Sequence, residues 1–337
     1  MRESVAITIT ESSQIGEARR VAIALATGLG FQETERGKVG IVVTEIASNL
    51  IQHGQGGVLL LRLIEHNSAI GIEVLSLDKG RGMVDVDECL QDGFSTAGTL
   101  GNGLGAIRRL SGLFEIYSIP NKGTALVAHL WSGSTPHAPK KTLEIGAICL
   151  PKRGEEVSGD AWACQVDRCR SLLLVVDGLG HGPAAATAAS SAVRIFQEHD
   201  RSPGAIIEAA HAALRSTRGA VLAVAEIDFE QQSVRFAGIG NIAASIFSFS
   251  DRHHLLSHNG TVGHEIRKIQ EFSYPWYANG LLIMHSDGLD SKWQLDRYSG
   301  LSQKHPSLIA GVLYRDFNRE RDDVTVLVAK GMGNNNS

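Results

Sequence analysis

The chain has 337 residues, of which 43% are hydrophobic and 20% are charged, as is typical of folded globular proteins rather than of disordered or fibrous chains. At roughly 150 residues per domain, this length predicts two domains. Lys and Arg together number 32 against 36 Asp and Glu, a formal net charge of −4, which provides no basic field for nucleic acid or an anionic membrane.

The four cysteines include no C-x-x-C pair, so we expect reduced thiols rather than disulfide bonds. No window approaches the roughly 20 apolar residues of a membrane span. The first residues, MRESVAITITESS, contain no apolar signal-peptide region. These features predict a cytoplasmic protein with neither a membrane nor a nucleic acid as its partner.

Residues 1–131 are predicted to form the first domain. The alternating run VAITIT predicts a strand, and apolar residues at helical spacing then predict helices at 15–28 and 34–53. The elements expected after them are strands near 58–64 and 70–75, a Gly-rich stretch at 78–105, a helix near 106–111, and strands at 114–118 and 124–131. This order predicts an α/β two-layer sandwich with helices on one face of a mixed sheet.

Residues 132–141, SGSTPHAPKK, hold two of the eight prolines and are predicted to be a linker. The second domain is placed at 142–331, where many short apolar runs typical of strands surround two helical segments at 183–198 and 203–217. Many strands with one helix pair favour a sandwich over a parallel βαβ repeat. The tail, 332–337, is expected to be disordered.

Three polar motifs follow one another in the first domain. Glu45, Asn49 and His53 are spaced by four residues, which places them on one helical face among apolar neighbours. The run Asp78–Gly82, DKGRG, puts a carboxylate and two glycines at a strand end, where the backbone can approach a flat ring. The run Gly101–Gly105, GNGLG, leads into a helix whose N-terminus can hold phosphates.

Each motif alone has a purely structural explanation: a solvated helix face, a turn, or a flexible loop. Their fixed order is what predicts a nucleotide site. The Gly-rich loop departs from G-x-G-x-x-G and lies far into the chain, which excludes a Rossmann dinucleotide fold.

The ordered motifs EIASN, DKGRG and GNGLG, followed by NKGTALV, resemble the ATP-binding fold of the gyrase, Hsp90, histidine-kinase and MutL class. Within that class the resemblance is to serine/threonine switch kinases of the RsbT and RsbW type. It implies that Glu45 is the general base for a protein hydroxyl and that Asn49 binds the Mg²⁺ ion on the ATP phosphates. The residues implied for the adenine amine, the adenine pocket, the lid and the far side of the base are Asp78, Gly80, Gly82, Gly101, Gly103, Gly105 and Thr124.

Aspartates end or precede several apolar runs of the second domain: Asp160, Asp177, Asp287, Asp322 and Asp323. A single Asp-Gly is more often a turn, but recurrence at strand ends favours carboxylates that converge in space. Crowded carboxylates repel one another, and an oxygen-liganded Mg²⁺ or Mn²⁺ ion relieves the repulsion. A pair of such ions would activate a water for in-line attack on a phosphoester.

The series GEEVSGDAW, LLLVVDGLGHG, FAGIGN, HNGTVGH, LLIMHSDGL and RDDVTVLV resembles the SpoIIE and RsbX type of metal-dependent serine/threonine protein phosphatases, in the protein phosphatase 2C-like (PP2C) class. The resemblance implies an αββα sandwich with two Mn²⁺ or Mg²⁺ ions, and the whole chain is then of the α+β class. The implied ligands are Asp160, Asp177, the Gly178 carbonyl, Asp287 and Asp322, with Asp323 as the alternative to Asp322.

Together the two resemblances imply opposing activities on one switch. The leading interpretation is a bifunctional regulator of a bacterial partner-switching pathway, in which the first domain uses ATP and Mg²⁺ to phosphorylate a STAS-domain antagonist or scaffold and the second removes the phosphate. A sigma factor or a downstream activator is a candidate further partner, and a homodimer is a candidate assembly. One alternative is a phosphatase gated by a nucleotide-sensing domain that transfers nothing; another is a non-catalytic anti-sigma or scaffold-binding module.

Overall fold

The computed structural model describes residues 4–66, 69–90, 103–133, 142–198, 201–248 and 251–333. Contacts divide these residues into two units. The N-terminal unit comprises residues 4–133 together with Gln303–Arg315, and the C-terminal unit comprises residues 142–302 and 316–333. Most of the predicted linker, and Gly101 of the predicted lid, lie outside the described residues. In the ranges described, no helix has the length and apolar character needed to cross a membrane.

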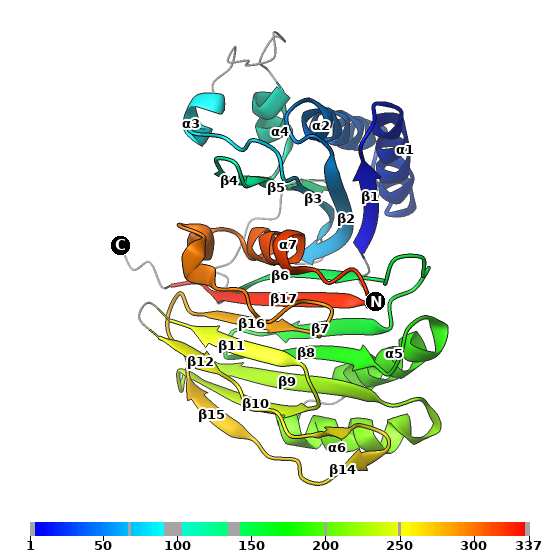
Figure 1. Cartoon of the computed structure of the whole chain (residues 1–337), viewed down its shortest axis with the longest axis vertical. Helices are drawn as coiled ribbons and strands as arrows, with labels where there is room; N and C mark the ends of the chain where they lie inside the picture. The colour runs from blue at the N-terminus through cyan, green and yellow to red at the C-terminus, as the bar shows by residue number, and fades with distance from the viewer. Residues whose placement is uncertain are drawn as a thin grey trace. The chain divides into compact units, whose positions relative to one another are not determined.

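The N-terminal unit is built on a five-stranded sheet with the strand order β1-β2-β3-β5-β4. Its strands are β1 (Ser4–Ile9), β2 (Gly57–His66), β3 (Ala69–Leu77), β4 (Leu113–Ile119) and β5 (Gly123–Trp131). Its helices α1 (Ser13–Gly28), α2 (Glu33–Gln52) and α4 (Gly103–Leu110) lie together on one face of the sheet, and α3 (Val86–Cys89) is a single turn (Figure 1). The predicted two-layer sandwich is confirmed, but every strand pairing is antiparallel where we expected a mixed sheet.

The helices of this unit are held in place by a shared apolar core. Helix α1 buries Ala18, Ala22 and Ala26, which are spaced by four residues and therefore share one face. Helix α2 begins with a capping box, in which the Gln32 N–H donates to the Glu35 carboxylate at 2.7 Å. Seven buried apolar or glycine positions of α2 then fix the helix against the sheet. The polar residues on its remaining face are thereby held in defined positions.

Helix α7 (Pro306–Phe317) comes late in the chain, but its first ten residues belong to the N-terminal unit. Eight consecutive residues, Pro306 to Leu313, are buried. We expected residues 142–331 to form one domain. No pattern in the sequence indicated that Gln303–Arg315 would be grouped with the N-terminal unit. The apolar residues of α7 surround the whole helix, so the periodicity does not reveal which surfaces they cover.

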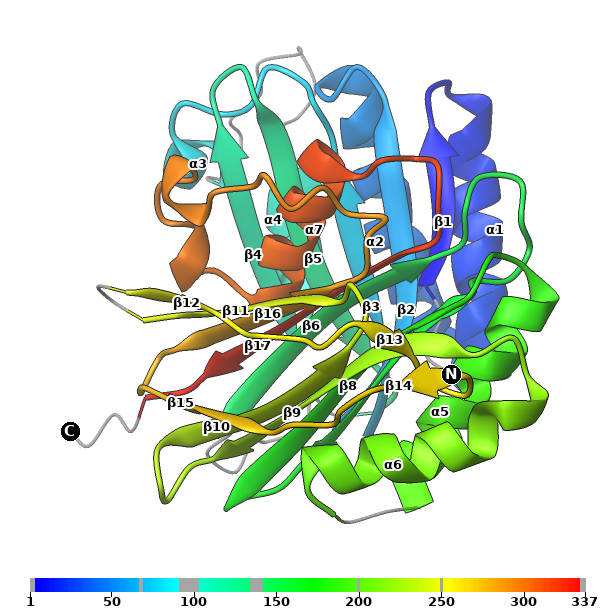
Figure 2. The ribbon, with the colours of Figure 1, turned by 60° about the horizontal axis from the view of Figure 1, so that its bottom comes forward.

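The C-terminal unit contains two five-stranded sheets with the orders β15-β10-β9-β8-β7 and β12-β11-β16-β17-β6. The strands of the first sheet are β7 (Asp160–Val166), β8 (Arg170–Gly178), β9 (Ala220–Asp228), β10 (Ser233–Ile239) and β15 (Phe272–Pro275). Those of the second are β6 (Leu143–Leu150), β11 (Ala243–Phe247), β12 (Arg252–His254), β16 (Leu281–His285) and β17 (Val324–Gly331). Helices α5 (Pro183–Glu198) and α6 (Pro203–Ala213) lie together against the first sheet (Figure 2). The short elements are β13 (Gly260–Thr261), β14 (Glu265–Ile266), η1 (Leu214–Ser216), η2 (Leu295–Arg297) and η3 (Leu301–Gln303).

The central strand β8 shows why its sequence is apolar throughout rather than alternating. Leu173 and Val175 join the core between the two sheets, whereas Leu172, Leu174 and Val176 join the core under α5 and α6. Both faces of the strand are therefore buried. Because side chains alternate along a strand, the next odd-numbered residue after Val175 also points between the sheets. That residue is Asp177, the first charged group on this face of the strand.

Candidate functional site

Asp78 follows β3 in the N-terminal unit and is fixed by the backbone around it. Its Oδ1 atom accepts hydrogen bonds from the N–H groups of Gly80 at 2.8 Å and Thr124 at 3.1 Å. The Asp78 N–H in turn donates to the Thr124 carbonyl at 3.0 Å. Burial raises the pKa of Asp78 above its usual value, despite these bonds. Both backbone bonds use Oδ1, so the geometry leaves Oδ2 to accept from the amine of a ligand.

The two glycines after Asp78 stand where a side chain has no room. A Cβ atom on Gly80 would lie 2.5 Å from the His53 carbonyl oxygen, and one on Gly82 would lie 2.2 Å from that of Ile119. Gly82 also has a φ of +65°, which favours glycine. The backbone therefore forms a close-packed wall at these two glycines, and the role of that wall in an adenine pocket stays a prediction.

Ser118 on β4 is part of this wall and was not predicted. Its hydroxyl accepts a hydrogen bond from the Met83 N–H at 2.8 Å and shares another with the Thr124 hydroxyl at 2.9 Å. The residue lies in an ordinary strand pattern, so no local signal in the sequence marked it. It ties the loop after Gly82 to the strand that carries Thr124.

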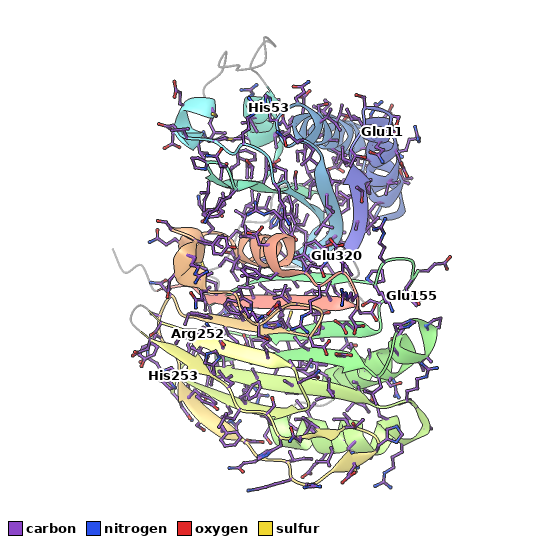
Figure 3. The ribbon with its side chains drawn as sticks, in the orientation of Figure 1. Glu11, His53, Glu155, Arg252, His253 and Glu320 are labelled. Carbon is purple, nitrogen blue, oxygen red and sulfur yellow. The ribbon has the colours of Figure 1, made fainter. Side chains whose placement is uncertain are left out.

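The polar face of α2 forms the other end of the site. Glu45 lies beside the first turn of α4, because a Cβ atom on Gly103 would be only 2.8 Å from its Oε2. The amide nitrogen of Asn49 is buried and has no hydrogen-bond partner among the described residues. His53 is exposed at the end of α2, where its N–H donates to the Asn49 carbonyl at 2.9 Å (Figure 3). Glu45 thus lies at the start of α4, where two of the lid glycines are found, and His53 is the C-cap of α2.

These features fit a magnesium nucleotide. A buried amide NH₂ group with no acceptor is rare, and a phosphate oxygen would accept from it and leave the Asn49 Oδ1 atom for a metal ion. The N-terminus of α4, at Gly103 and Gly105, offers backbone N–H groups to phosphate. The carboxylate of Asp78 and the backbone at Gly80 suit a flat, amine-bearing ring. The assignment of individual residues to ATP and Mg²⁺ stays a prediction.

The acid cluster of the C-terminal unit begins on two paired strands. Asp160 at the start of β7 is the register partner of Asp177 at the end of β8. Residues directly opposite one another in an antiparallel pair point to the same face. Trp162 and Val175 of the same strands lie in the core between the sheets, so both carboxylates point into the sandwich. Two acids are therefore confined at one end of an apolar interior.

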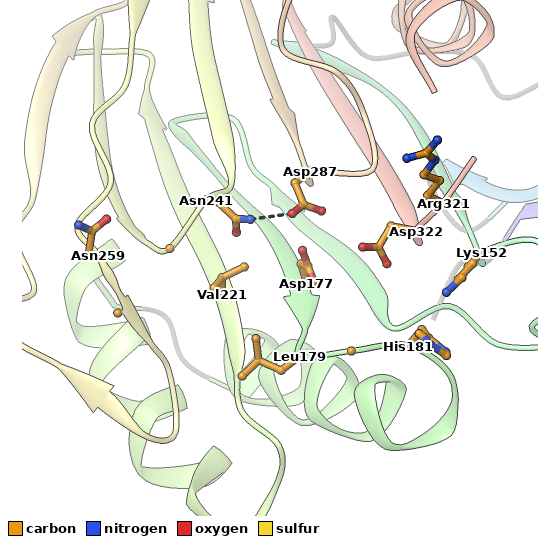
Figure 4. Close-up of a pocket in the computed structure, with 13 residues that line it drawn as sticks. Lys152, Asp177, Leu179, His181, Val221, Asn241, Asn259, Asp287, Arg321 and Asp322 are labelled. Atoms are coloured by element: carbon orange, nitrogen blue, oxygen red, sulfur yellow. Dashed lines mark hydrogen bonds between the residues drawn. The ribbon is translucent and has the colours of Figure 1, made fainter. Parts of the chain in front are cut away.

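A cavity of about 620 Å³ lies in front of this pair. Asp177, Asp287 and Asp322 line it, and their carboxylates face one another (Figure 4). They come from three separate places: the end of β8, the loop after β16 and the approach to β17. Asp160 is 1% exposed and is not among the residues that line the cavity. The described residues at its rim include two cations, Lys152 and Arg321.

The carboxylates are costly to ionise together. Burial, reinforced by the charges of Asp287 and Asp322, raises the pKa of Asp177 to about 7. Burial, followed by the charge of Asp177, raises the pKa of Asp160 well above its usual range. Burial and then Asp322 also raise the pKa of Asp287. A divalent cation would stabilise the ionised forms, and an all-oxygen donor set of this kind fits Mg²⁺ or Mn²⁺.

Neighbouring groups orient the cluster. The Asn241 amide donates to Asp287 Oδ2 at 2.8 Å, and the Ser286 hydroxyl donates to Asp160 Oδ2 at 2.6 Å. Sequence reasoning missed Asn241 and Ser286, although the FAGIGN and HSDG motifs contain them. Ser286 lies directly before Asp287, which the sequence analysis did mark.

Asp322 and Asp323 have different surroundings. Asp323 accepts hydrogen bonds from the Lys152 N–H at 2.7 Å and the Gly159 N–H at 2.9 Å, so it fastens two backbone segments. Asp322 instead lines the cavity. This difference favours Asp322 as the metal ligand of the pair. The ligand set, including the Gly178 carbonyl, stays a prediction.

The raised pKa of Asp177 has a consequence for stability. Its folded pKa of about 7 lies above the usual 3.8, so the unfolded chain loses this proton first and rising pH destabilises the metal-free protein between those values. We expect the Tm in EDTA to fall from about pH 5 to about pH 7, and added Mn²⁺ to raise it most at the upper end. Scanning fluorimetry of the wild type and Asp177→Asn measures the effect. If the two proteins show the same pH dependence, the carboxyl does not titrate as described.

Comparison with known proteins gives two matches in chain order. Residues 9–129 match the model of the histidine kinase-like ATPase domain, and residues 167–331 match that of stage II sporulation protein E, SpoIIE. The serine/threonine-protein kinase RsbT of Bacillus subtilis (strain 168) is 28% identical over 131 residues, 39% of this chain and 98% of RsbT. The phosphoserine phosphatase RsbX of the same organism is 28% identical over 144 residues, 42% of this chain and 72% of RsbX.

Three solved structures are similar to this chain in fold. A structure from work on the bacterial stressosome has a TM-score of 0.53 at 29% identity, covering 56% of this chain and 98% of its own. RsbX in complex with magnesium has a TM-score of 0.52 at 22% identity, covering 58% and 98%. The PP2C phosphatase domain of Bacillus subtilis SpoIIE, with a fragment of its regulatory domain, has a TM-score of 0.50 at 19% identity over 96% of both chains.

Proposed function

The chain joins a histidine kinase-like ATPase domain to a SpoIIE-type domain with the PP2C phosphatase fold, and we propose that it both adds and removes one phosphate on a protein serine or threonine. The observation that carries the proposal is the convergence of Asp177, Asp287 and Asp322 on one cavity, in a chain whose N-terminal part matches an ATPase domain. Phosphate transfer from ATP and hydrolysis of the phosphoester are separate reactions, and we assign one of them to each site.

In the N-terminal unit a nucleotide, when bound, would extend from Asp78 towards the first turn of α4. Asp78 accepts from the adenine amine, and the backbone at Gly80 and Gly82 fits the ring. At the opposite end Asn49 holds the Mg²⁺ ion that neutralises phosphate charge when bound. Glu45, beside Gly103, accepts the proton of the attacking hydroxyl, a role that contributes about 10²–10⁴-fold in comparable enzymes.

In the C-terminal unit Asp177, Asp287 and Asp322 would hold two divalent ions, with Asp160 behind them. When bound, such ions supply a hydroxide nucleophile near neutral pH and stabilise charge on the phosphoester. The remaining residues prepare the site: Asn241 orients the Asp287 carboxylate, and Asp323 holds the Lys152 and Gly159 backbones beside the cavity.

We infer that the substrate is a STAS-domain protein of a bacterial stress switch. The support is the similarity of the two parts to RsbT and RsbX, whose names describe a serine/threonine kinase and a phosphoserine phosphatase, and to a stressosome structure. A phosphate adds about −1.5 to −2 charges, enough to break an interface through repulsion and desolvation. Opposing activities in one chain would set the fraction of partner that is phosphorylated.

Labelled ATP tests this proposal. Incubating a candidate STAS-domain protein with γ-labelled ATP and Asp177→Asn should place label on a serine or threonine, because the variant cannot remove it. Wild-type protein with Mn²⁺ should then release that label as inorganic phosphate. A partner that stays unlabelled even with Asp177→Asn contradicts the kinase half, and label that survives wild-type treatment contradicts the phosphatase half.

A further inference from the structure

The start of α7 is anchored to a buried ionic cluster on β3. Glu73 is only 2% exposed. Its carboxylate accepts hydrogen bonds from Arg62 at 2.8 Å and from the Ser307 hydroxyl at 2.6 Å, and it is paired with His129 at 2.9 Å. Three partners surround one carboxylate inside the N-terminal unit. Removing one of them would leave a buried charge less well satisfied, so this end of the helix is firmly held.

Further along, α7 follows β3 to the nucleotide site. Gly311 lies so close to the strand that a Cβ atom there would be 2.8 Å from Leu77 Cδ2. One turn later the Arg315 guanidinium donates to the Asp78 carbonyl oxygen at 3.0 Å. The backbone of the predicted adenine-binding residue is therefore held by an arginine that lies 237 residues away in the sequence.

Beyond Arg315 the same segment is bonded to the loop of the metal centre. The Asp290 N–H donates to the Phe317 carbonyl at 2.9 Å, and the Arg319 N–H donates to the Gly288 carbonyl at 2.9 Å. Gly288 directly follows Asp287 in the chain. All of these residues belong to the C-terminal unit, so the contacts of this continuous segment change from one unit to the other after Arg315.

We propose that Arg315 is a positioning residue for the Asp78 loop and that α7 couples nucleotide occupancy to the metal centre. The inference rests on the proposed nucleotide site but does not require phosphate transfer. A continuous helix joins the Asp78 carbonyl to the loop after Asp287, and Asp322 follows seven residues beyond Arg315. Within the N-terminal unit Arg315 holds the Asp78 backbone, and within the C-terminal unit Asp287 and Asp322 face one cavity. Ligands at the two sites therefore favour the same state, and by linkage each strengthens the other.

Hydrolysis of p-nitrophenyl phosphate in excess Mg²⁺, with and without ADP, tests the coupling on the full chain. ADP is used because it cannot donate a γ-phosphate. We expect ADP to raise kcat/KM of the wild type at least about fivefold, the lower end of typical allosteric coupling. Arg194, an exposed arginine on α5 of the C-terminal unit, supplies a matched control. Arg194→Ala should respond to ADP as the wild type does.

Arg315→Ala should lose the response to ADP and bind ADP more weakly, whereas Arg315→Lys should keep part of both because a cation remains near the carbonyl. An unchanged ADP response in Arg315→Ala overturns the proposal. So does a wild type that binds ADP and hydrolyses the substrate at one rate with and without it. A wild type that binds no ADP refutes the nucleotide site itself, which separates the two failures.

Hydrogen exchange in the wild type keeps the test independent of variants that fold poorly. ADP should slow amide exchange in Gln303–Arg315 and also in residues 286–290, which belong to the other unit. If protection is limited to the N-terminal unit, the effect of ADP does not reach the loop after Asp287, and the proposed coupling is wrong.

Discussion

Asp177→Asn is expected to lower metal-dependent hydrolysis of a phosphoserine peptide more than about 100-fold, with little loss of folded protein. Asp177 lies where two strands bring carboxylates face to face, and it borders the cavity shared with Asp287 and Asp322. Asn preserves the shape of the side chain but removes the charge that a divalent ion needs. Because burial and neighbouring acids already make this charge costly, with a pKa of about 7, its removal does not destabilise the metal-free fold.

Asp167 provides the control for this change. It is exposed and directly follows β7, so Asp167→Asn makes the same substitution at the opposite end of the β7–β8 hairpin. Steady-state release of phosphate, measured over a range of Mn²⁺ concentrations, should be near wild type for Asp167→Asn. If excess Mn²⁺ restores Asp177→Asn to full activity, Asp177 contributes to affinity but not to the reaction, and its predicted role at the centre is wrong.

The elements that carry this site could be predicted because their signals are local. Strand β8 reads as an uninterrupted apolar run, since both of its faces are buried, and the run ends on Asp177. Helix α2 places Glu45 and Asn49 on one face through spacing alone. The two-layer and two-sheet architectures follow from the order of such elements.

What could not be predicted depends on contacts between distant segments. Ser118 matters only because Met83 and Thr124 meet it in space, and nothing in the surrounding strand sequence marks it. The choice between Asp322 and Asp323 was open because adjacent residues at a strand start carry equal sequence signals. It is their partners, the backbone N–H groups of Lys152 and Gly159 on Asp323, that distinguish them.

Helix α7 is the extreme case. Sequence order assigned it to the second domain, yet Ser307 and Arg315 make their bonds in the first unit. Apolar residues surround its buried part, so a helical period shows that it is buried but not against what. The sequence of β3 does not identify the contact either, because a glutamate within a strand, Glu73, does not indicate that the Ser307 hydroxyl will donate to it.

Glu45→Gln is expected to lower phosphate transfer from γ-labelled ATP to the partner by about 10²–10⁴-fold while leaving nucleotide affinity within about twofold. The carboxylate lies beside Gly103, at the end of the site assigned to the phosphates, and Gln has nearly the same size and shape as Glu. Only the ability to accept the hydroxyl proton is lost. Transfer should be measured in the Asp177→Asn background, so that the phosphatase does not remove the product.

Asn49→Ala separates binding from chemistry at the same helix face. Its amide is buried without a protein partner, so its loss should weaken binding of a fluorescent ADP analogue in Mg²⁺ at least tenfold, and transfer should fall with occupancy. Glu33→Gln, at the exposed start of α2, about four turns from Asn49 and about three from Glu45, should change neither quantity. If Glu45→Gln weakens binding as much as Asn49→Ala does, Glu45 acts in holding the nucleotide. If it leaves transfer intact, another group takes the proton and the assignment of the general base is wrong.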